Sequence, residues 1–371
     1  ITTHNTGLGA NISSEDHEKY IQQVAERLGA VYYYFKPDVL YTHDYWGLDI
    51  GASIFSEHYY YNPSYWMHDI HEFIKGYEGV LDEERLKYAL QVEREKIKIP
   101  DKLISVNEAI AHLICEEYDL HFEDFIILPN VPREQLEIPG YSLRNKIGIS
   151  ETTPLGVYLG RATELRGLDL ILHTLQEIEE LHIVLFSASL RAYTNSLNEK
   201  AKERGVSSRL HIFDYVPDYA VAFACREADF GLSPLKKYGN SDLAVPTKVY
   251  EYIHAEIPVV ASDTFLQKKF IEQNDIGLIF RNKDGEKGLL DSVKQILNPS
   301  DSKYFKNKCL SLKETYKWDN VFKPIVDFID SWKDFPQYSS SRSRGVFQGP
   351  AGSAGQPAIL ASGLREINVK S

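Results

Sequence analysis

The sequence predicts an α/β protein built from two doubly wound, parallel-sheet domains. Short apolar runs typical of buried strands alternate with helical segments, and this alternation favours a parallel sheet with helices on both faces. The series occurs twice, once across residues 39–128 and again across residues 155–297, with a Pro-containing stretch between them. With 371 residues the chain is long enough for two domains of ordinary size.

The composition is that of a globular protein, with 43% hydrophobic residues to form a core. The net charge of −12 disfavours nucleic acid as a partner, because nucleic-acid binding needs a basic face. Three widely spaced cysteines indicate neither a disulfide framework nor a zinc motif and favour a reducing compartment. No apolar run approaches the length of a membrane span. We therefore expect a cytoplasmic protein, and peripheral contact with the inner face of a membrane is left open.

The two ends of the chain look atypical. Ile1 is not an initiator methionine, so we expect the natural product to begin earlier. Residues 336–371 are rich in Ser, Gly, Pro and Ala, and we expect them to form a flexible tail or to be left by cloning.

The first domain is predicted over residues 1–133, with a linker at 134–150. Ser13 or Ser14 can cap an opening helix whose apolar stripe includes Ile21 and Leu28. Strands are predicted at 39–42, 65–67, 103–106 and 125–128, and helices near 48–56, 82–98 and 108–118.

The second domain is predicted over residues 151–315, followed by a last amphipathic helix within 316–335. Its strands are predicted at 155–159, 183–186, 210–213, 230–232, 259–261 and 277–280. Its helices are predicted at 169–179, 197–204, 220–227, 247–255 and 288–297.

The stretch 233–262 organises this second domain. A long polar loop leads to Pro246, whose fixed φ suits the start of a helix. Free backbone N–H groups at a helix N-terminus bind anions, typically phosphate. Lys248 adds a positive charge and Glu251 adds a carboxylate one turn later, so the pair could hold the phosphate and the ribose of a nucleotide. A solvated Lys–Glu pair on a helix face is the alternative.

A second cationic group follows the predicted strand at 155–159. Gly160 allows a sharp turn, and Arg161 and Arg166 follow it at the carboxyl end of the strand. Ligands of open α/β sheets bind outside the carboxyl ends of strands, and two guanidinium groups suit a diphosphate. Surface arginines paired with Glu164 or Asp169 are the alternative.

Histidines follow two strands of the first domain, in the segments 41–44 and 67–72. His68, His71 and Glu72 are conceivable metal ligands, but this spacing is weak evidence and we predict no metal. We favour hydrogen bonds to a polyhydroxyl ligand. The alternative is that neighbouring carboxylates satisfy the histidines.

Two further features carry less information. The aromatic residues at 32–34, 45–46, 59–61 and 65–66 are expected mostly to pack, although some could line an acceptor cleft. The loop at 215–217 could present backbone groups to a flat base. Asp229 precedes a strand, and we expect it to cap a helix rather than to catalyse.

Taken in order, several motifs resemble the retaining glycosyltransferases of group 1, also called family 4, which have the GT-B fold. The resemblance covers residues 37–334 and depends on the order of the motifs. It is carried by PDVLYTHD (37–44), WMHDIHE (66–72), DKLISVNEAIAHLI (101–114), IILPNVP (126–132), GVYLGRATELRGLDLIL (156–172), VPTKVYEYIHAEIPVVAS (245–262), GLIF (277–280) and YKWDNVFKPIVDF (316–328).

The resemblance implies two Rossmann-like domains facing a cleft, with a UDP- or GDP-linked sugar bound mainly by the second. It implies transfer to a glycan, a lipid-linked sugar or a small molecule, with retention of anomeric configuration and without a cofactor or an obligatory metal. The catalytic candidates are His68, Arg161 and Arg166. The donor-binding candidates are Gly160, Val216, Asn240, Ser241, Thr247, Lys248 and Glu251. The acceptor-side candidates are His43 and Asp69.

The chain also departs from the family pattern. Arg166 replaces a lysine, Leu243 replaces a glutamate that contacts the donor sugar, and Glu256 replaces a glycine. Asn240, Ser241 or Asp242 could substitute for the missing glutamate. We expect the first domain to lack its opening strands, which would precede Ile1.

Two other functions stay open. A nucleotide-sugar 2-epimerase would need carboxylates for acid–base chemistry, for which Asp69, Glu72 and Asp242 are candidates. A binding partner without catalysis would explain Leu243. An NAD-dependent dehydrogenase is disfavoured, because neither domain has a G-x-G-x-x-G turn after its first visible strand.

Overall fold

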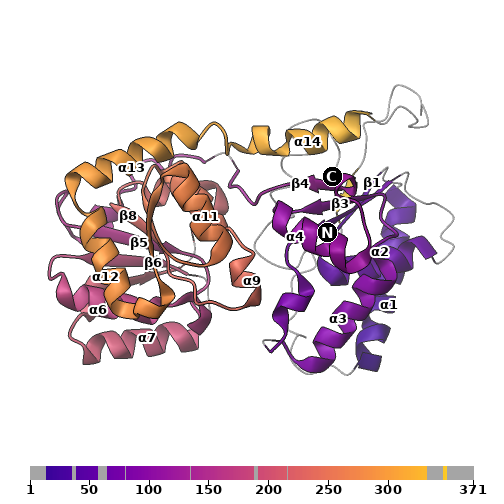
Figure 1. The fold of residues 1–371 in the computed structure, drawn as a ribbon, viewed down its shortest axis with the longest axis horizontal. Helices are drawn as coiled ribbons and strands as arrows, with labels where there is room; N and C mark the ends of the chain where they lie inside the picture. The colour runs from indigo at the N-terminus through magenta and orange to yellow at the C-terminus, as the bar shows by residue number, and fades with distance from the viewer. Residues whose placement is uncertain are drawn as a thin grey trace. The chain divides into compact units, whose positions relative to one another are not determined.

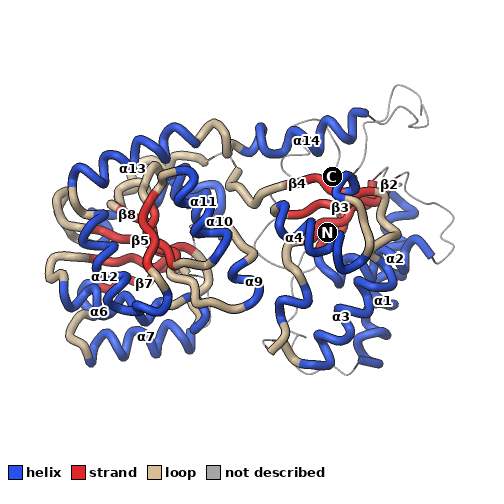
Figure 2. The backbone as a smooth tube through the Cα atoms, in the orientation of Figure 1, coloured by secondary structure: helices blue, strands red, loops and turns tan. Residues whose placement is uncertain are grey.

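The computed structural model describes residues 14–35, 39–56, 65–79, 81–133, 135–187, 191–214, 216–331 and 346–348. The chain divides into two compact units, each with its own parallel sheet (Figure 1 and Figure 2). The first unit is Ile1–Pro129 together with Val321–Ser371, and the second is Asn130–Asn320. Among the described helices, none combines the length and apolar character that crossing a membrane requires.

The sheet of the first unit has the strand order β11-β1-β2-β3-β4, and every neighbouring pair is parallel. Its strands are β1 (Val39–His43), β2 (Tyr65–Ile70), β3 (Lys102–Ser105), β4 (Phe125–Ile127) and β11 (Val346–Gln348). The four strands predicted from the sequence all form. In the β1–β2 register, Thr42 lies opposite His68 and His43 lies opposite Asp69. The polar ends of the two strands therefore meet at one edge of the sheet.

The strand β11 corrects the prediction of a flexible tail for three of its residues. Val346, Phe347 and Gln348 pair in parallel with Val39, Leu40 and Tyr41 of β1. The strand could not be foreseen from the sequence, because a three-residue segment between glycines, with only two apolar residues, is too short to show a periodic pattern. The outer edge of β1 offers unpaired backbone groups that such a run can bond. The rest of the predicted tail lies outside the described residues.

Helices pack against this sheet and against one another. They are α1 (Ser14–Phe35), α2 (Asp44–Ser56), α3 (Glu83–Lys96), α4 (Glu108–Tyr118) and, from Val321 onward, α14 (Trp318–Ser331), with short 3-10 turns at Ile74–Tyr77 and Phe122–Asp124. Ile21 and Leu28 of α1 pack with Ile50 and Ile54 of α2. Asp82 and Asn107 cap α3 and α4 through their side-chain oxygens, which is why both helices begin where polar residues precede them.

The sheet of the second unit has the order β10-β9-β8-β5-β6-β7 and is parallel throughout. Its strands are β5 (Leu155–Leu159), β6 (His182–Phe186), β7 (Leu210–Phe213), β8 (Phe230–Ser233), β9 (Val259–Ser262) and β10 (Gly277–Phe280). The chain builds one half of the sheet outward from β5, then returns to β8 on the other side. This reversal makes the β5–β8 edge a topological switch point, where doubly wound sheets bind ligands.

The helices of the second unit cover both faces of its sheet. They are α5 (Leu143–Ile147), α6 (Ile171–Glu177), α7 (Arg191–Glu203), α8 (Val221–Cys225), α9 (Gly239–Asp242), α10 (Thr247–Ala255), α11 (Phe265–Asn274), α12 (Gly285–Ile296) and α13 (Pro299–Leu312). The 3-10 turns are Glu164–Arg166, Leu168–Leu170, Ser207–Arg209, Asp218–Ala220 and Asn282–Asp284. The predicted helix at 169–179 is shorter, because its first turn is 3-10. The helices α5, α9, α11 and α13 were not predicted.

Residues 134–150, predicted as a linker, include α5 and a buried polar network. Arg144 is buried, and its guanidinium donates to the carbonyl oxygens of Ser150 and Thr153 and to the Asp229 carboxylate. Asp229 also accepts from the Leu155 N–H at the start of β5 (2.9 Å). Asp229 therefore fastens α5 to the sheet, whereas the sequence suggested a helix cap.

One buried carboxyl group makes the first unit sensitive to pH. Glu93 of α3 is buried, and its Oε2 accepts a hydrogen bond from the Tyr118 hydroxyl of α4 (2.7 Å). Burial raises the pKa of Glu93 from 4.5 to about 7, because the charged form loses its hydration. The folded state therefore holds a proton that the unfolded state has already released.

We predict that the wild-type protein loses stability as the pH rises from 4.5 to about 7, and that Glu93→Gln abolishes this loss. Between pH 4.5 and about 7 the folded protein binds more protons at this site than the unfolded chain, so wild-type stability falls. The glutamine keeps an acceptor for Tyr118 and carries no charge, so at pH 8 the variant should be more stable by up to about 3 kcal/mol. Urea unfolding at pH 5, 6, 7 and 8 measures this, with the exposed Glu95→Gln as control. An unchanged pH slope in Glu93→Gln would contradict the assignment.

Candidate functional site

The loops that follow β5 and β8 are joined at the switch point of the second unit. The Lys236 N–H donates to the Leu165 carbonyl oxygen (3.0 Å). Gly167 has a φ of +64°, and a methyl group on its Cα would overlap the Pro234 carbonyl oxygen. Only glycine meets both conditions without strain. The loop after β5, which carries Arg161 and Arg166, is thus held against the loop after β8.

The helix α10 is anchored beside these loops by Tyr252. Its hydroxyl accepts from the Leu159 N–H at the end of β5 (3.2 Å) and donates to the Leu232 carbonyl oxygen of β8 (3.0 Å). Gly231 of β8 makes room for the ring, because a methyl group there would overlap it. Tyr252 was not singled out from the sequence, although its position four residues after Lys248 on the same helix was a usable signal.

Lys248 lies over the carboxyl end of β5. Its Nζ is 4.6 Å from the centre of the Tyr158 ring, and a methyl group on Gly160 (φ +107°) would lie 3.8 Å from its Cε. Lys248 is buried. Burial and the nearby Arg166 lower the pKa of this amine, while Glu251, also buried in α10, raises it. The structure thus brings Gly160, Arg166, Lys248 and Glu251 together.

The cations of this site are not neutralised by ion pairs within the described part of the chain. Neither Arg161, Arg166 nor Lys248 forms a salt bridge with a described residue. Asp169, which the alternative interpretation paired with an arginine, lies instead 3.4 Å from Lys236 Nζ. Arg161 is exposed, while Arg166 is half-buried. A site with this excess of positive charge is suited to an anion that carries more than one charge.

The remaining donor-side candidates have different surroundings. Thr247 is the half-buried first residue of α10, and the half-buried Val216 follows β7, two strands from β5. Ser241 exchanges hydrogen bonds with the Tyr238 backbone (2.7 and 2.8 Å). Asp242 accepts from the Phe265 N–H at the start of α11 (2.7 Å). Of the three candidates to replace the glutamate at position 243, these two bond to neighbouring backbone, and the third, Asn240, is buried.

In the first unit, His68 belongs to a buried network on one face of the sheet. The Trp66 indole N–H donates to the Thr42 hydroxyl oxygen (2.8 Å), and that hydroxyl lies 2.8 Å from His68 Nδ1. The Thr42 hydroxyl can donate to this nitrogen or accept from it, according to which tautomer the His68 ring adopts. Burial lowers the pKa of His68 to about 3, so it is neutral at physiological pH.

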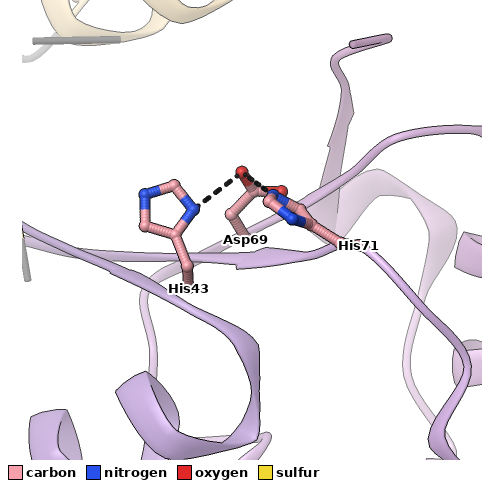
Figure 3. A group of neighbouring side chains, drawn as sticks. All are labelled: His43, Asp69 and His71. Carbon is pink, nitrogen blue, oxygen red and sulfur yellow. Dashed lines mark hydrogen bonds and ion pairs between the residues drawn. The ribbon is translucent and has the colours of Figure 1, made fainter. Parts of the chain in front are cut away.

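His43, Asp69 and His71 lie together, and strand alternation places His43 and Asp69 on the opposite face from His68 (Figure 3). Asp69 Oδ2 is 3.2 Å from His43 Nδ1, 2.9 Å from His71 Nε2 and 3.2 Å from the Tyr41 hydroxyl, which donates to it. Burial alone would raise the pKa of Asp69, but the two histidines hold it well below its usual value. Burial alone would lower the pKa of His71, but Asp69 raises it to about 9.

This group differs from the set that the sequence suggested as conceivable metal ligands. Among the described residues, the group with ligand atoms within 4.8 Å of one another contains His71 but neither His68 nor Glu72. His43 and Asp69, the acceptor-side candidates, are both in it. The sequence missed the combination because the contact between β1 and β2 depends on strand register.

The fold is a GT-B architecture, and the second unit gathers cationic side chains at its topological switch point. Residues 153–299 match the family model described as glycosyl transferases group 1, which confirms the predicted resemblance for that part of the chain. A search of curated protein sequences gave no match.

Solved structures of low sequence identity share the fold over most of the chain. Sucrose-phosphate synthase from Thermosynechococcus elongatus is similar with a TM-score of 0.69 and 14% identity, over 86% of this chain and 80% of that chain. HepE from Anabaena in complex with UDP-glucose is similar with a TM-score of 0.66 and 12% identity, over 83% and 82% of the two chains. WaaG, a glycosyltransferase involved in lipopolysaccharide biosynthesis, is similar with a TM-score of 0.60 and 16% identity, over 76% and 82%. These similarities confirm the predicted GT-B fold.

We predict that Gly167→Ala destabilises the second unit far more than an equivalent change elsewhere. Gly205→Ala is the matched control, because the φ of Gly205 (+70°) is close to that of Gly167 (+64°). A methyl group on Gly205, however, would meet only open space. The control should cost about 1 kcal/mol for backbone strain alone. Gly167→Ala should cost about 3 kcal/mol or more, because the added methyl group also meets Pro234. Equal losses in urea unfolding would show that the two loops are not held by this contact.

Proposed function

We propose that this protein is a retaining glycosyltransferase that transfers a sugar from a nucleotide-diphosphate sugar to a glycan, lipid-linked or small-molecule acceptor. The observation that carries the proposal is the group of cations without described ion-pair partners at the β5–β8 edge. This group lies inside the segment that matches the group 1 glycosyltransferase model. A transferase of this kind needs positive charge where its diphosphate leaving group develops negative charge.

The residues of the candidate site in the second unit have the following proposed roles. Arg161 and Arg166 hold the diphosphate, and Lys248 with the first N–H groups of α10, beginning at Thr247, adds a second set of donors. Glu251 accepts hydrogen bonds from the ribose hydroxyls. Gly160 lets the backbone turn beneath these groups. As the bond between the sugar and the diphosphate breaks, the electron pair moves to the diphosphate oxygen, and these donors stabilise the charge.

The donor sugar and its base are further parts of the proposal. HepE, one of the similar structures, was solved with UDP-glucose and with UDP, which makes uracil the first base to test. Val216 is proposed to border the base. Asn240, Ser241 or Asp242 is proposed to contact the sugar in place of the glutamate missing at Leu243.

Retention of configuration, hexosyl transfer and independence of metal for transfer stay predictions from the resemblance. So do the roles of His68, His43 and Asp69, and a cytoplasmic location with peripheral membrane contact.

The two rival functions differ in their support. A 2-epimerase would use Asp69, Glu72 or Asp242 as an acid or base, and two of these carboxylates are already engaged, Asp69 with three neighbours and Asp242 with the start of α11. This disfavours the epimerase. A sugar-nucleotide-binding subunit without catalysis is favoured by one observation, the apolar Leu243 at the family's glutamate position. Binding without turnover would identify it.

We predict that a nucleoside diphosphate binds the second unit and raises the melting temperature of the protein. A ligand that binds only the folded state stabilises it by mass action. UDP, GDP, ADP and TDP are compared by thermal shift, and the sugars of the best nucleotide are then tested for turnover and for the anomeric configuration of the product by NMR. No shift with any of the four would refute the donor-site assignment.

We also predict that Arg166→Ala weakens binding of that nucleotide by about 10- to 100-fold, the loss expected for one charge-assisted contact. Arg166→Lys should lose less, because it keeps the charge. Arg204→Ala is the control, since Arg204 is an exposed arginine that pairs with Glu286 (2.9 Å) away from these loops. Isothermal titration calorimetry gives the dissociation constants, and wild-type affinity in Arg166→Ala would remove Arg166 from the site.

A further inference from the structure

His43, Asp69 and His71 combine the ligand types that transition metals prefer. Two imidazoles and one carboxylate form the protein ligand set of many zinc and non-haem iron sites. One ligand atom of each residue lies within 4.8 Å of the others, and His43 and Asp69 are buried while His71 is partly so. Figure 3 shows both rings directed at the carboxylate, from the ends of β1 and β2.

Two of the three separations among these ligand atoms are close to those that one ion would impose. Ligand atoms bound at about 2.1 Å to a tetrahedral zinc ion lie about 3.4 Å apart. Asp69 Oδ2 lies 3.2 Å from His43 Nδ1 and 2.9 Å from His71 Nε2. To bind one ion, these two separations would open by a few tenths of an ångström, and the two histidine nitrogens, which lie within 4.8 Å of each other, would move toward about 3.4 Å.

A second observation points to a ligand at the same place. Asp69 Oδ1 is buried and has no hydrogen-bond partner among the described residues, whereas Oδ2 has three neighbours. A buried carboxylate oxygen that stays unsatisfied is costly and calls for an explanation. A cation bound by both oxygens of the carboxylate would satisfy it.

The surrounding groups favour a cation over an anion. Asp44 Oδ1 is 3.9 Å from His71 Nδ1, the ring nitrogen on the far side from Asp69, and the next residue in the chain is Glu72. Tyr41 supports Asp69 by donating to it. Metal-binding histidines commonly direct their second nitrogen at a carboxylate, and such outer partners orient the ligands.

We propose that His43, Asp69 and His71 bind one divalent transition-metal ion, with Zn²⁺ as the probe. The site lies within the first unit and does not depend on the proposed transferase function. The ion would join the end of β1 to the end of β2 and fix the start of α2, which follows His43 directly. Its role is assigned as structural, because two of its three ligands are buried.

The test is titration of the full chain with Zn²⁺ by calorimetry after treatment with a chelator. We expect saturable binding of one ion with a micromolar or lower dissociation constant, and a higher melting temperature when the ion is bound. Asp69→Asn keeps the shape of the side chain and removes its charge, and His71→Ala removes a ligand outside the strand. Each variant should weaken binding by 100-fold or more, and circular dichroism checks that each variant folds.

The matched control is His211→Gln, which changes a histidine pair in the second unit. His211 Nε2 lies 2.9 Å from His182 Nδ1, so this pair is the obvious competing site for zinc. Wild-type zinc affinity in the control, together with its loss in the Asp69 and His71 variants, supports the proposal. Loss of binding in His211→Gln, unchanged binding in both Asp69→Asn and His71→Ala, or no saturable binding in the wild type overturns it.

Discussion

The proposed donor site depends on one hydroxyl group. Tyr252 joins α10 to the last residue of β5 and to β8, the two strands at which the sheet of the second unit reverses its order. This contact sets where Lys248 and Glu251 lie relative to the loop that carries Arg166. The hydroxyl both accepts and donates within a buried region, so replacing it with hydrogen would leave backbone groups of both strands unsatisfied. A residue with no proposed contact to any ligand thus determines the geometry of those that have one.

The two units hold charge in opposite ways. At the switch point of the second unit, Arg161, Arg166 and Lys248 form no salt bridge with a described residue, and burial lowers the pKa of the Lys248 amine. In the first unit, charges are paired tightly, with Asp69 between two histidines. A buried charge without a counter-ion destabilises the folded state, and such charges are found at functional sites, where a ligand of opposite charge can bind. The paired charges of the first unit need no ligand for balance. Asp69 Oδ1, however, has no hydrogen-bond partner among the described residues.

Much of the fold could be predicted because its signals are local. The strand β5 and the helix α10 form at the predicted residues, since an apolar run ends at a glycine in one case and a helical stripe lies between two prolines in the other. The helices α11 and α13 were missed because they bury few residues, Gln267 and Ile271 in one and Cys309 in the other, so they lack an apolar stripe. The cations of the second unit follow strand ends and could be foreseen. The His43–Asp69–His71 group depends on pairing between strands that lie far apart in sequence, and local patterns do not give register.

The bond between Lys236 and Leu165 and the close contact at Gly167 have a consequence for how a ligand would be received. The two loops are held together by protein contacts alone, so they are already ordered before anything binds. Association then requires little loss of conformational entropy in this part of the chain, and the affinity gained from each charged contact is not spent on arranging the loops. A diphosphate bound as proposed would meet a preorganised arrangement of charges, and a ligand whose phosphates are spaced differently would fit that arrangement less well.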